Sequence, residues 1–442
     1  MSKLALLGGE ATVREQYADM FKWPIITPEI EQAVLQELRR GTMSNIDATE
    51  KFEAAFAAWQ GVKYALAHPN GTSALIAAMF ALGVGTGDEV ILPSITYWAS
   101  GLQLYSLGAT PVFAETQMDT LCLDPKDLER VIGPRTKAII VVHYLGHPAD
   151  MDGIMKVAKK HKLRVIEDVS HAQGGLYKGK MLGTFGDVAG MSLMSGKSFA
   201  IGEGGMLTTD DREVYERALA WGHYERNNPD YITSPQLMPL VGLPLGGVKN
   251  RLNQLASVMG LEQLKVYDEQ AAEIRRAMNR FWDLLEGTPG IRAHRVDERT
   301  GSTMAGWYAA HGLYVPEELG GLSVTRFCDA VTAEGVESVY PGANKPLHTH
   351  ALMQTADLYH DGKPTRIRFA ERDVRELDKH LPVSEAIPTR TYFTPWFKHD
   401  RPEIIERYAE AFRKVCTSYR DLLKDDPGNS PGLGAWYFAK AK

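Results

Sequence analysis

The sequence predicts an α/β fold with a mostly parallel sheet. In the first half of the chain, short apolar runs alternate with amphipathic stretches, of which residues 150–161 are a clear example. The strand-like runs occupy residues 89–92, 110–114, 138–143, 164–168 and 188–193. Such alternation is typical of parallel sheets, because the connection between two parallel strands is usually a helix.

The first element that bears on function is a strand, a turn and a helix. Residues 64–68 predict a short strand, residues 69–73 a turn and residues 74–82 an apolar helix. A second strand-like run, residues 90–99, ends in the adjacent aromatics Tyr97 and Trp98.

The elements after residue 220 are of several kinds. Residues 222–245 are rich in Pro, Gly and Asn and predict a long loop that borders the active site or a partner subunit. The remaining predictions are a helix over 251–285, strands over 307–315 and 366–369, a helix over 403–423 and a turn-rich stretch over 425–434. The aromatic end, Trp436 to Phe438, has no role that the sequence indicates.

Composition excludes several classes of protein. A chain of 442 residues is too long for one core, and its net charge of −6 provides no basic patch for nucleic acid. We expect no signal peptide, no membrane span and no metal, because neither the apolar runs nor the 13 histidines form the required patterns. Cys122, Cys328 and Cys416 are far apart, which fits a reducing cytoplasm.

Two residues indicate the cofactor. Lys197 follows an apolar stretch and precedes a Gly-Glu-Gly-Gly turn, and Asp168 closes a buried strand 29 positions earlier. A lysine amine can form a Schiff base with a carbonyl cofactor, and a carboxylate can keep a pyridine nitrogen protonated. A lone lysine in such a stretch is usually a solvated loop residue, and a lone aspartate usually caps a helix. Together, however, the two predict pyridoxal phosphate.

Two further segments could complete that site. Gly71, Thr72 and Ser73 would present backbone N–H groups at a helix N-terminus, where an anion is favoured, and Ser192 could add a hydroxyl to the same phosphate. An ordinary helix start explains the turn equally well. Either aromatic at 97 and 98 could stack on a flat ring, with core packing as the alternative.

A family resemblance joins these segments. The chain resembles the DegT/DnrJ/StrS family of sugar aminotransferases, among the fold-type I pyridoxal phosphate enzymes. The matching segments include Trp23-Pro24, Asn70-Gly71-Thr72, Pro93 to Tyr97, Glu167 to His171, Gly183 to Asp187, Ser192 to Lys197 and Gly202 to Gly205. The resemblance implies a large domain, residues 1–250, with a mostly parallel seven-stranded sheet flanked by helices. It implies a smaller α+β domain over residues 251–442.

The resemblance also assigns roles. It implies that Lys197 carries the cofactor, that Asp168 pairs with the pyridine nitrogen and that His171 faces the phenolic oxygen. Tyr97 would then stack on the ring. Gly71, Thr72 and Ser192 would hold the phosphate. A lysine, where dehydratase-type relatives carry histidine, favours amino transfer.

Two positions depart from the family pattern. Relatives commonly have Asn where this chain has Lys249, and that Asn reaches the phosphate in the neighbouring subunit. The resemblance therefore implies a homodimer in which Lys249 or Asn250 makes this contact. Met194 replaces the histidine of many nucleotide-sugar enzymes, which favours relatives that act on cyclitols or other non-nucleotide rings.

The expected function is amino transfer from L-glutamate or L-glutamine to a keto sugar or keto-cyclitol, in amino-sugar or aminocyclitol biosynthesis for antibiotics or polysaccharides. Elimination and retro-aldol cleavage remain alternatives, because they would use the same lysine and aspartate. A regulator that senses pyridoxal phosphate without catalysis is a third alternative, although such a protein usually carries a nucleic-acid module.

Overall fold

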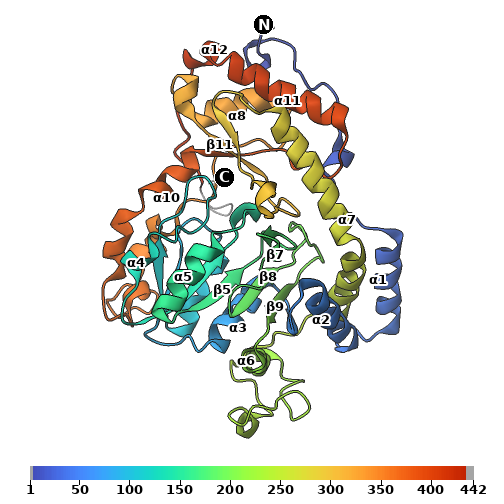
Figure 1. Cartoon of the computed structure of the whole chain (residues 1–442), viewed down its shortest axis with the longest axis vertical. Coiled ribbons are helices and arrows are strands. Elements are labelled where there is room, and N and C mark those ends of the chain that lie inside the picture. The colour runs from blue at the N-terminus through green and yellow to red at the C-terminus, as the bar shows by residue number, and fades with distance from the viewer. Residues whose placement is uncertain (1–2, 435–442) are drawn as a thin grey trace.

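The computed structural model of the chain describes residues 3–434 and is built around one sheet of seven strands (Figure 1). The strand order is β1-β9-β8-β5-β4-β2-β3. Strand β9 is antiparallel to β1 and β8, and the other pairs are parallel. The strands are β1 Tyr64–His68, β2 Glu89–Pro93, β3 Thr110–Ala114, β4 Thr136–Val142, β5 Arg164–Asp168, β8 Val188–Ser192 and β9 Gly205–Thr209. The predicted α/β fold with a mostly parallel sheet is confirmed.

The helices that precede residue 285 cover this sheet, pack against other helices of the group or link the sheet to the rest of the chain. They are α1 Pro28–Arg40, α2 Asp47–Gln60, α3 Gly71–Ala81, α4 Leu128–Val131, α5 Met151–His161, α6 Arg212–Gly222 and α7 Gln254–Leu284. The ends of helix α5 carry residues that explain why the sequence predicts them. The Asp150 side chain caps its first turn by accepting the N–H of Gly153, and its last turn carries basic residues that suit the helix dipole.

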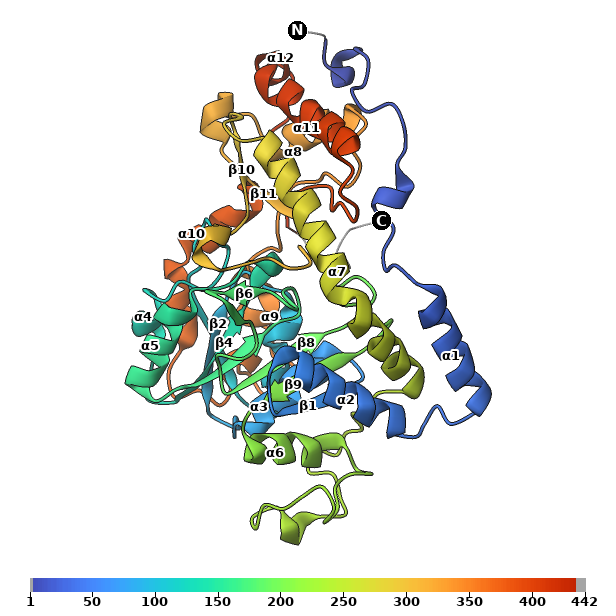
Figure 2. The same cartoon turned by 45° about the vertical axis from the view of Figure 1, so that its right-hand side comes forward.

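A second layer of structure lies above the sheet in Figures 1 and 2, at the far end of the long helix α7. Its three-stranded antiparallel sheet has the order β10-β11-β12. The strands and α-helices not yet named, some of them beside the large sheet, are β6 Leu176–Tyr177, β7 Lys180–Met181, β10 Ile291–Ala293, β11 His311–Tyr314, β12 Thr391–Phe393, α8 Val324–Ala333, α9 Ala351–Gln354, α10 Pro382–Ala386, α11 Pro402–Thr417 and α12 Arg420–Leu423.

The buried apolar side chains form three clusters. One lies around the large sheet and includes residues from the C-terminal half, such as Leu347 and Ile387. A second joins the start of the chain, for example Leu4, to α7, α8 and α11. The third lies between α2, β8 and the start of α7. The division into domains 1–250 and 251–442 stays a prediction, since clusters describe packing and not independent folding.

Several predicted elements differ from the observed ones. The predicted strand at 366–369 is wrong: Thr365–Ile367 is a 3-10 helix, and buried Arg366 anchors it through Asp378 and the carbonyl of Pro111. The predicted strand at 307–315 is shorter, because φ is +49° at both Trp307 and Ala309.

Two further predicted elements have different boundaries in the structure. Strand β2 stops at Pro93, so Tyr97 and Trp98 follow it instead of ending it. The predicted helix over 403–423 is two helices, α11 and α12, with a break at Ser418 and Tyr419. The aromatic end at 436–438 lies outside the described residues.

Two further features concern the helices and the cysteines of the described residues. No helix within 3–434 combines the length and apolar character needed to cross a membrane. Cys122, Cys328 and Cys416 are buried free thiols.

Candidate active site

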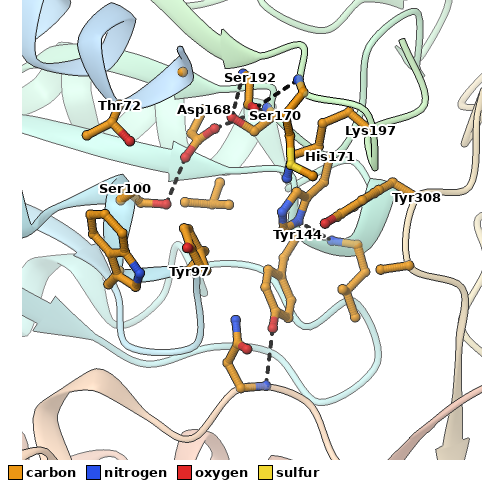
Figure 3. Close-up of a pocket in the computed structure, with 18 of the residues that line it drawn as sticks. Thr72, Tyr97, Ser100, Tyr144, Asp168, Ser170, His171, Ser192, Lys197 and Tyr308 are labelled. Atoms are coloured by element: carbon orange, nitrogen blue, oxygen red, sulfur yellow. Dashed lines mark hydrogen bonds between the residues drawn. The ribbon is translucent and has the colours of Figure 1, made fainter. Parts of the chain in front are cut away.

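A cavity of about 630 Å³ opens at the carboxyl ends of the parallel strands (Figure 3). Turns that follow β1, β2, β5 and β8 supply one side, and loops from the C-terminal half supply the other. This is the edge at which ligands bind in open α/β sheets. The lining residues discussed below are Asn70, Gly71, Thr72, Tyr97, Trp98, Ser100, Tyr144, Leu145, Asp168, Ser170, His171, Ser192, Met194, Lys197, Glu203, Tyr308, Ala309, Tyr340, Asn344 and Phe393.

Lys197 lies in the connection between β8 and β9. Its N–H donates to the carbonyl of Met194 at 2.9 Å, and its own carbonyl accepts from the indole of Trp23 at 2.7 Å. The residue is only 7% exposed, and this burial lowers the pKa of Lys197 to about 8, although the nearby Asp168 carboxylate acts in the opposite direction. A substantial share of the amine is therefore neutral near pH 8, as a nucleophile or base requires.

Asp168 is the last residue of β5 and is buried at the cavity wall. One carboxylate oxygen accepts the Ser100 hydroxyl at 2.7 Å, and the other accepts the N–H of Ser170 at 3.0 Å. Thr96 lies 2.7 Å from the Ser100 hydroxyl. Because Ser100 donates to Asp168, Thr96 must donate to Ser100. These bonds hold the carboxylate in one orientation.

His171 follows in the same turn, and its protonation state can be read from its contacts. Leu145 donates its N–H to Nδ1 at 3.2 Å, so a neutral ring carries its proton on Nε2. Burial lowers the pKa of His171 well below 6.5, and the charge of Lys197 and the neighbouring His311 add to this. His171 is therefore a neutral donor through Nε2 at physiological pH.

The turn between β1 and α3 has the geometry of an anion site. Asn70 caps α3 by accepting the N–H of Ser73 at 2.8 Å. The helix leaves the N–H groups of Gly71 and Thr72 without intrahelical acceptors. A Cβ on Gly71 would lie 2.7 Å from the backbone of Ser192, so only glycine allows β8 to approach the turn this closely. The two interpretations of this turn, an ordinary helix start and an anion site, are therefore compatible with each other.

Tyr97 and Trp98 line the cavity side by side, with ring centroids 5.0 Å apart. Tyr97 is partly exposed, whereas Trp98 also packs against the core of the large sheet. Of the two aromatics, Tyr97 is therefore the better placed to cover a flat ligand.

The structure brings together seven of the nine sequence-predicted site residues: Gly71, Thr72, Tyr97, Asp168, His171, Ser192 and Lys197. It does not bring Lys249 and Asn250 into this cavity. Lys249 is exposed in the loop between α6 and α7, and its amine lies 5.6 Å from the ring centroid of Tyr224. Asn250 is buried, and its N–H donates to Gly222.

Sequence reasoning missed several lining residues. Ser100 and Ser170 had a signal, since they lie within three residues of Tyr97 and Asp168 in turns already singled out. Tyr144, Tyr308, Tyr340, Asn344 and Phe393 had none, because the tertiary fold brings them to the cavity from separate parts of the chain, Phe393 from the end of β12. Within residues 3–434, no group of His, Cys, Asp or Glu side chains is arranged to hold a metal ion.

The residues that meet here fit pyridoxal phosphate. Gly71 leaves a cradle with free N–H donors for a phosphate, a buried carboxylate is present for a pyridinium, and a buried amine of lowered pKa is present for a carbonyl.

Comparison with known proteins decides the family. The model of the DegT/DnrJ/EryC1/StrS aminotransferase family matches residues 24–372, which is most of the chain. The chain belongs to this family. It is therefore a pyridoxal phosphate-dependent aminotransferase, and its fold is of type I. The predicted family, enzyme class and cofactor are confirmed.

Individual relatives are similar over different lengths. The chain is 36% identical over 283 residues to the spore coat polysaccharide biosynthesis protein SpsC of Bacillus subtilis, covering 61% of this chain and 70% of that one. It is 35% identical over 407 residues to the L-glutamine:2-deoxy-scyllo-inosose aminotransferase of Streptomyces fradiae, covering 88% and 92%. Among solved structures, the aminotransferase from Psychrobacter cryohalolentis matches with a TM-score of 0.77 and 26% identity, over 90% of this chain and 100% of that one.

Proposed function

We propose that the chain transfers an amino group from L-glutamine to a keto-cyclitol, with Lys197 as its catalytic base. The observation that carries this proposal is the pairing of a buried amine, whose pKa is lowered to about 8, with a hydrogen-bonded Asp168 in one cavity. Pyridoxal phosphate, when bound, supplies a carbonyl that takes up the amino group and a ring that stores electrons.

The chain's own residues divide the remaining work. Lys197 would move a proton from the donor's α-carbon to the cofactor in the first half-reaction, and from the cofactor to the acceptor's carbon in the second. Asp168 would keep the pyridine nitrogen protonated, and Nε2 of His171 would donate to the phenolic oxygen. The N–H groups of Gly71 and Thr72 would bind the phosphate together with the Ser192 hydroxyl, and Tyr97 would cover the ring.

The residues that line the cavity favour a neutral, polyhydroxylated substrate. Among the described lining residues, Lys197 and His171 are the only basic side chains, so this chain offers no cluster of cations to a diphosphate. The wall instead offers hydroxyl and amide groups, among them those of Ser170 and Asn344, and the stacked rings of Tyr340 and Phe393, 4.0 Å apart. Such a surface suits a ring that has both hydroxyls and C–H faces.

The extent of similarity points the same way. A 2-deoxy-scyllo-inosose aminotransferase aligns with 88% of this chain, whereas the GDP-perosamine synthase of Caulobacter vibrioides aligns with 52%, although at a higher identity of 42%. A nucleotide-linked keto sugar is therefore the second candidate substrate.

A homodimer in the cytoplasm is part of this proposal. The loop between α6 and α7 extends away from the body of the molecule in both views (Figures 1 and 2). It carries Lys249 together with exposed apolar side chains, of which Leu243 is 76% exposed. Exposed apolar groups of this kind often mark a protein contact. In such a dimer, Lys249 would reach the partner's phosphate, whereas Asn250 is buried within its own chain.

The experiment that tests the substrate is a half-reaction. The enzyme is converted to its amino form with L-glutamine and freed of donor, and then mixed with scyllo-inosose or with a GDP-linked 4-keto sugar. We expect the cofactor's absorbance to return to the carbonyl form with the inosose. Return only with the nucleotide sugar would support the second candidate, and a β-eliminated or retro-aldol product from the donor would contradict amino transfer.

A further inference from the structure

Tyr308 contacts both Lys197 and His171 but has no part in the assignments above. The amine of Lys197 lies 4.1 Å from the centroid of the Tyr308 ring. The His171 ring lies 4.6 Å from the same centroid, at an interplanar angle of 39°. Figure 3 shows the three side chains grouped at one side of the cavity.

The backbone that carries Tyr308 is held in an unusual conformation. The residues on both sides of it, Trp307 and Ala309, have φ of +49°, in the left-handed region that side chains other than glycine rarely adopt. Such a conformation is strained and persists only where the surroundings enforce it. Such strain is commonly found where a side chain must be aimed at a functional site.

The surroundings that enforce this conformation include the residue next to Lys197. A Cβ on Gly306 would lie 2.1 Å from the Ser198 side chain, so the loop packs directly against the segment that bears the lysine. The indole of Trp396 donates to the Gly306 carbonyl at 2.9 Å, and its ring meets Tyr308 edge to face at 6.0 Å. The packing of Gly306 against Ser198 and the contacts of Trp396 thus fix the Tyr308 ring relative to Lys197.

We propose that the Lys197 amine rests against the face of the Tyr308 ring whenever the amine is not bonded to the cofactor. Tyr308 is then a positioning residue for proton transfer. An aromatic face attracts an ammonium and keeps it in place without an ion pair or hydrogen bond that would have to break. The inference deepens the proposed function and rests on Lys197 being the catalytic base.

The other groups near the amine do not replace this contact. Asp168 favours the charged amine, whereas the neutral His171 adds no fixed charge, and the lining residue Glu203 is exposed to solvent. Since burial disfavours the ammonium, removal of the aromatic face should lower the pKa of Lys197 further.

The test compares Tyr308→Leu with Tyr308→Phe, which keeps the ring and loses only the hydroxyl. The pKa of the Lys197 amine is measured on the full chain freed of cofactor, by labelling with a limiting amine reagent across the pH range, followed by peptide mapping. We expect the leucine variant to lower this pKa by about one unit and the phenylalanine variant to leave it nearly unchanged. Tyr340→Leu, which removes another ring of the same cavity, one that stacks on Phe393, serves as the matched control and should not shift it.

Two results would overturn the proposal: an unchanged Lys197 titration in Tyr308→Leu, or an equal shift in Tyr308→Phe. Circular dichroism monitors folding, and Tyr308→Met provides a second variant without a ring if the leucine variant does not fold. Because the titration involves neither cofactor nor substrate, it can succeed or fail independently of the substrate screen.

Discussion

The Ser100 hydroxyl donates a 2.7 Å hydrogen bond to Asp168, and a second residue of the same turn, Thr96, supports Ser100 in turn. A carboxylate at the end of β5 is therefore oriented by a turn that follows β2, two strands away in the sheet. This arrangement separates two effects that a mutation could have, namely loss of the charge and loss of its orientation.

Replacing Asp168 by Asn should lower turnover by several orders of magnitude with a small effect on donor binding. The amide keeps the size of the side chain but cannot keep a pyridine nitrogen protonated, and that charge acts mainly in the transition state. Steady-state kinetics would measure this split. The matched control, Ser100→Ala, keeps the charge and removes one hydrogen bond, so a loss of about tenfold is expected. Near-normal turnover in Asp168→Asn would contradict the role of this residue.

Replacing Lys197 by Met should stabilise the cofactor-free chain near pH 7. Below pH 8 the lysine is charged in both the folded and unfolded states, and the folded state bears the full cost of burying that charge. The cost disappears as pH rises from the folded pKa of about 8 to the usual value of 10.5, above which the amine is neutral in both states. The expected gain in unfolding free energy is up to about 3 kcal/mol.

Urea unfolding of both cofactor-free chains, at neutral pH and near pH 10.5, would measure this difference. We expect the difference to shrink at the higher pH. A gain of equal size at both values would show that it comes from packing and not from the amine.

Replacing Lys249 by Ala should weaken cofactor retention if this side chain reaches the partner's phosphate. Neither Lys249→Ala nor Lys197→Ala should then be active alone at limiting cofactor. Hybrids of the two should regain activity, because one of their sites combines a native Lys197 with the partner's native Lys249. Lys51→Ala, an exposed lysine on α2, is a suitable control. Full retention in Lys249→Ala, or a monomer by light scattering, would count against the shared site.

The sequence predicted the central strands well because their apolar runs are typical of parallel strands buried on both faces. Strands β3 and β5 agree with the prediction at both ends. The turn between β1 and α3 could also be predicted, since Asn70 and Gly71 follow a strand and precede an apolar helix.

Other features depend on tertiary contacts and could not be read locally. Arg366 looked like a strand residue, yet its partner Asp378 holds it in a 3-10 helix. Tyr308 gave no signal, because the left-handed residues beside it are enforced by segments far away in the sequence. The environments of Lys249 and Asn250 likewise depended on how the loop between α6 and α7 folds.

The most direct test of the account is chemical identification of the lysine that binds the cofactor. Borohydride reduction of the loaded enzyme, followed by peptide mapping, should place the pyridoxyl group on Lys197, and Lys197→Ala should remain folded and carry none. A pyridoxyl group on any other lysine of the wild-type chain would contradict the central assignment.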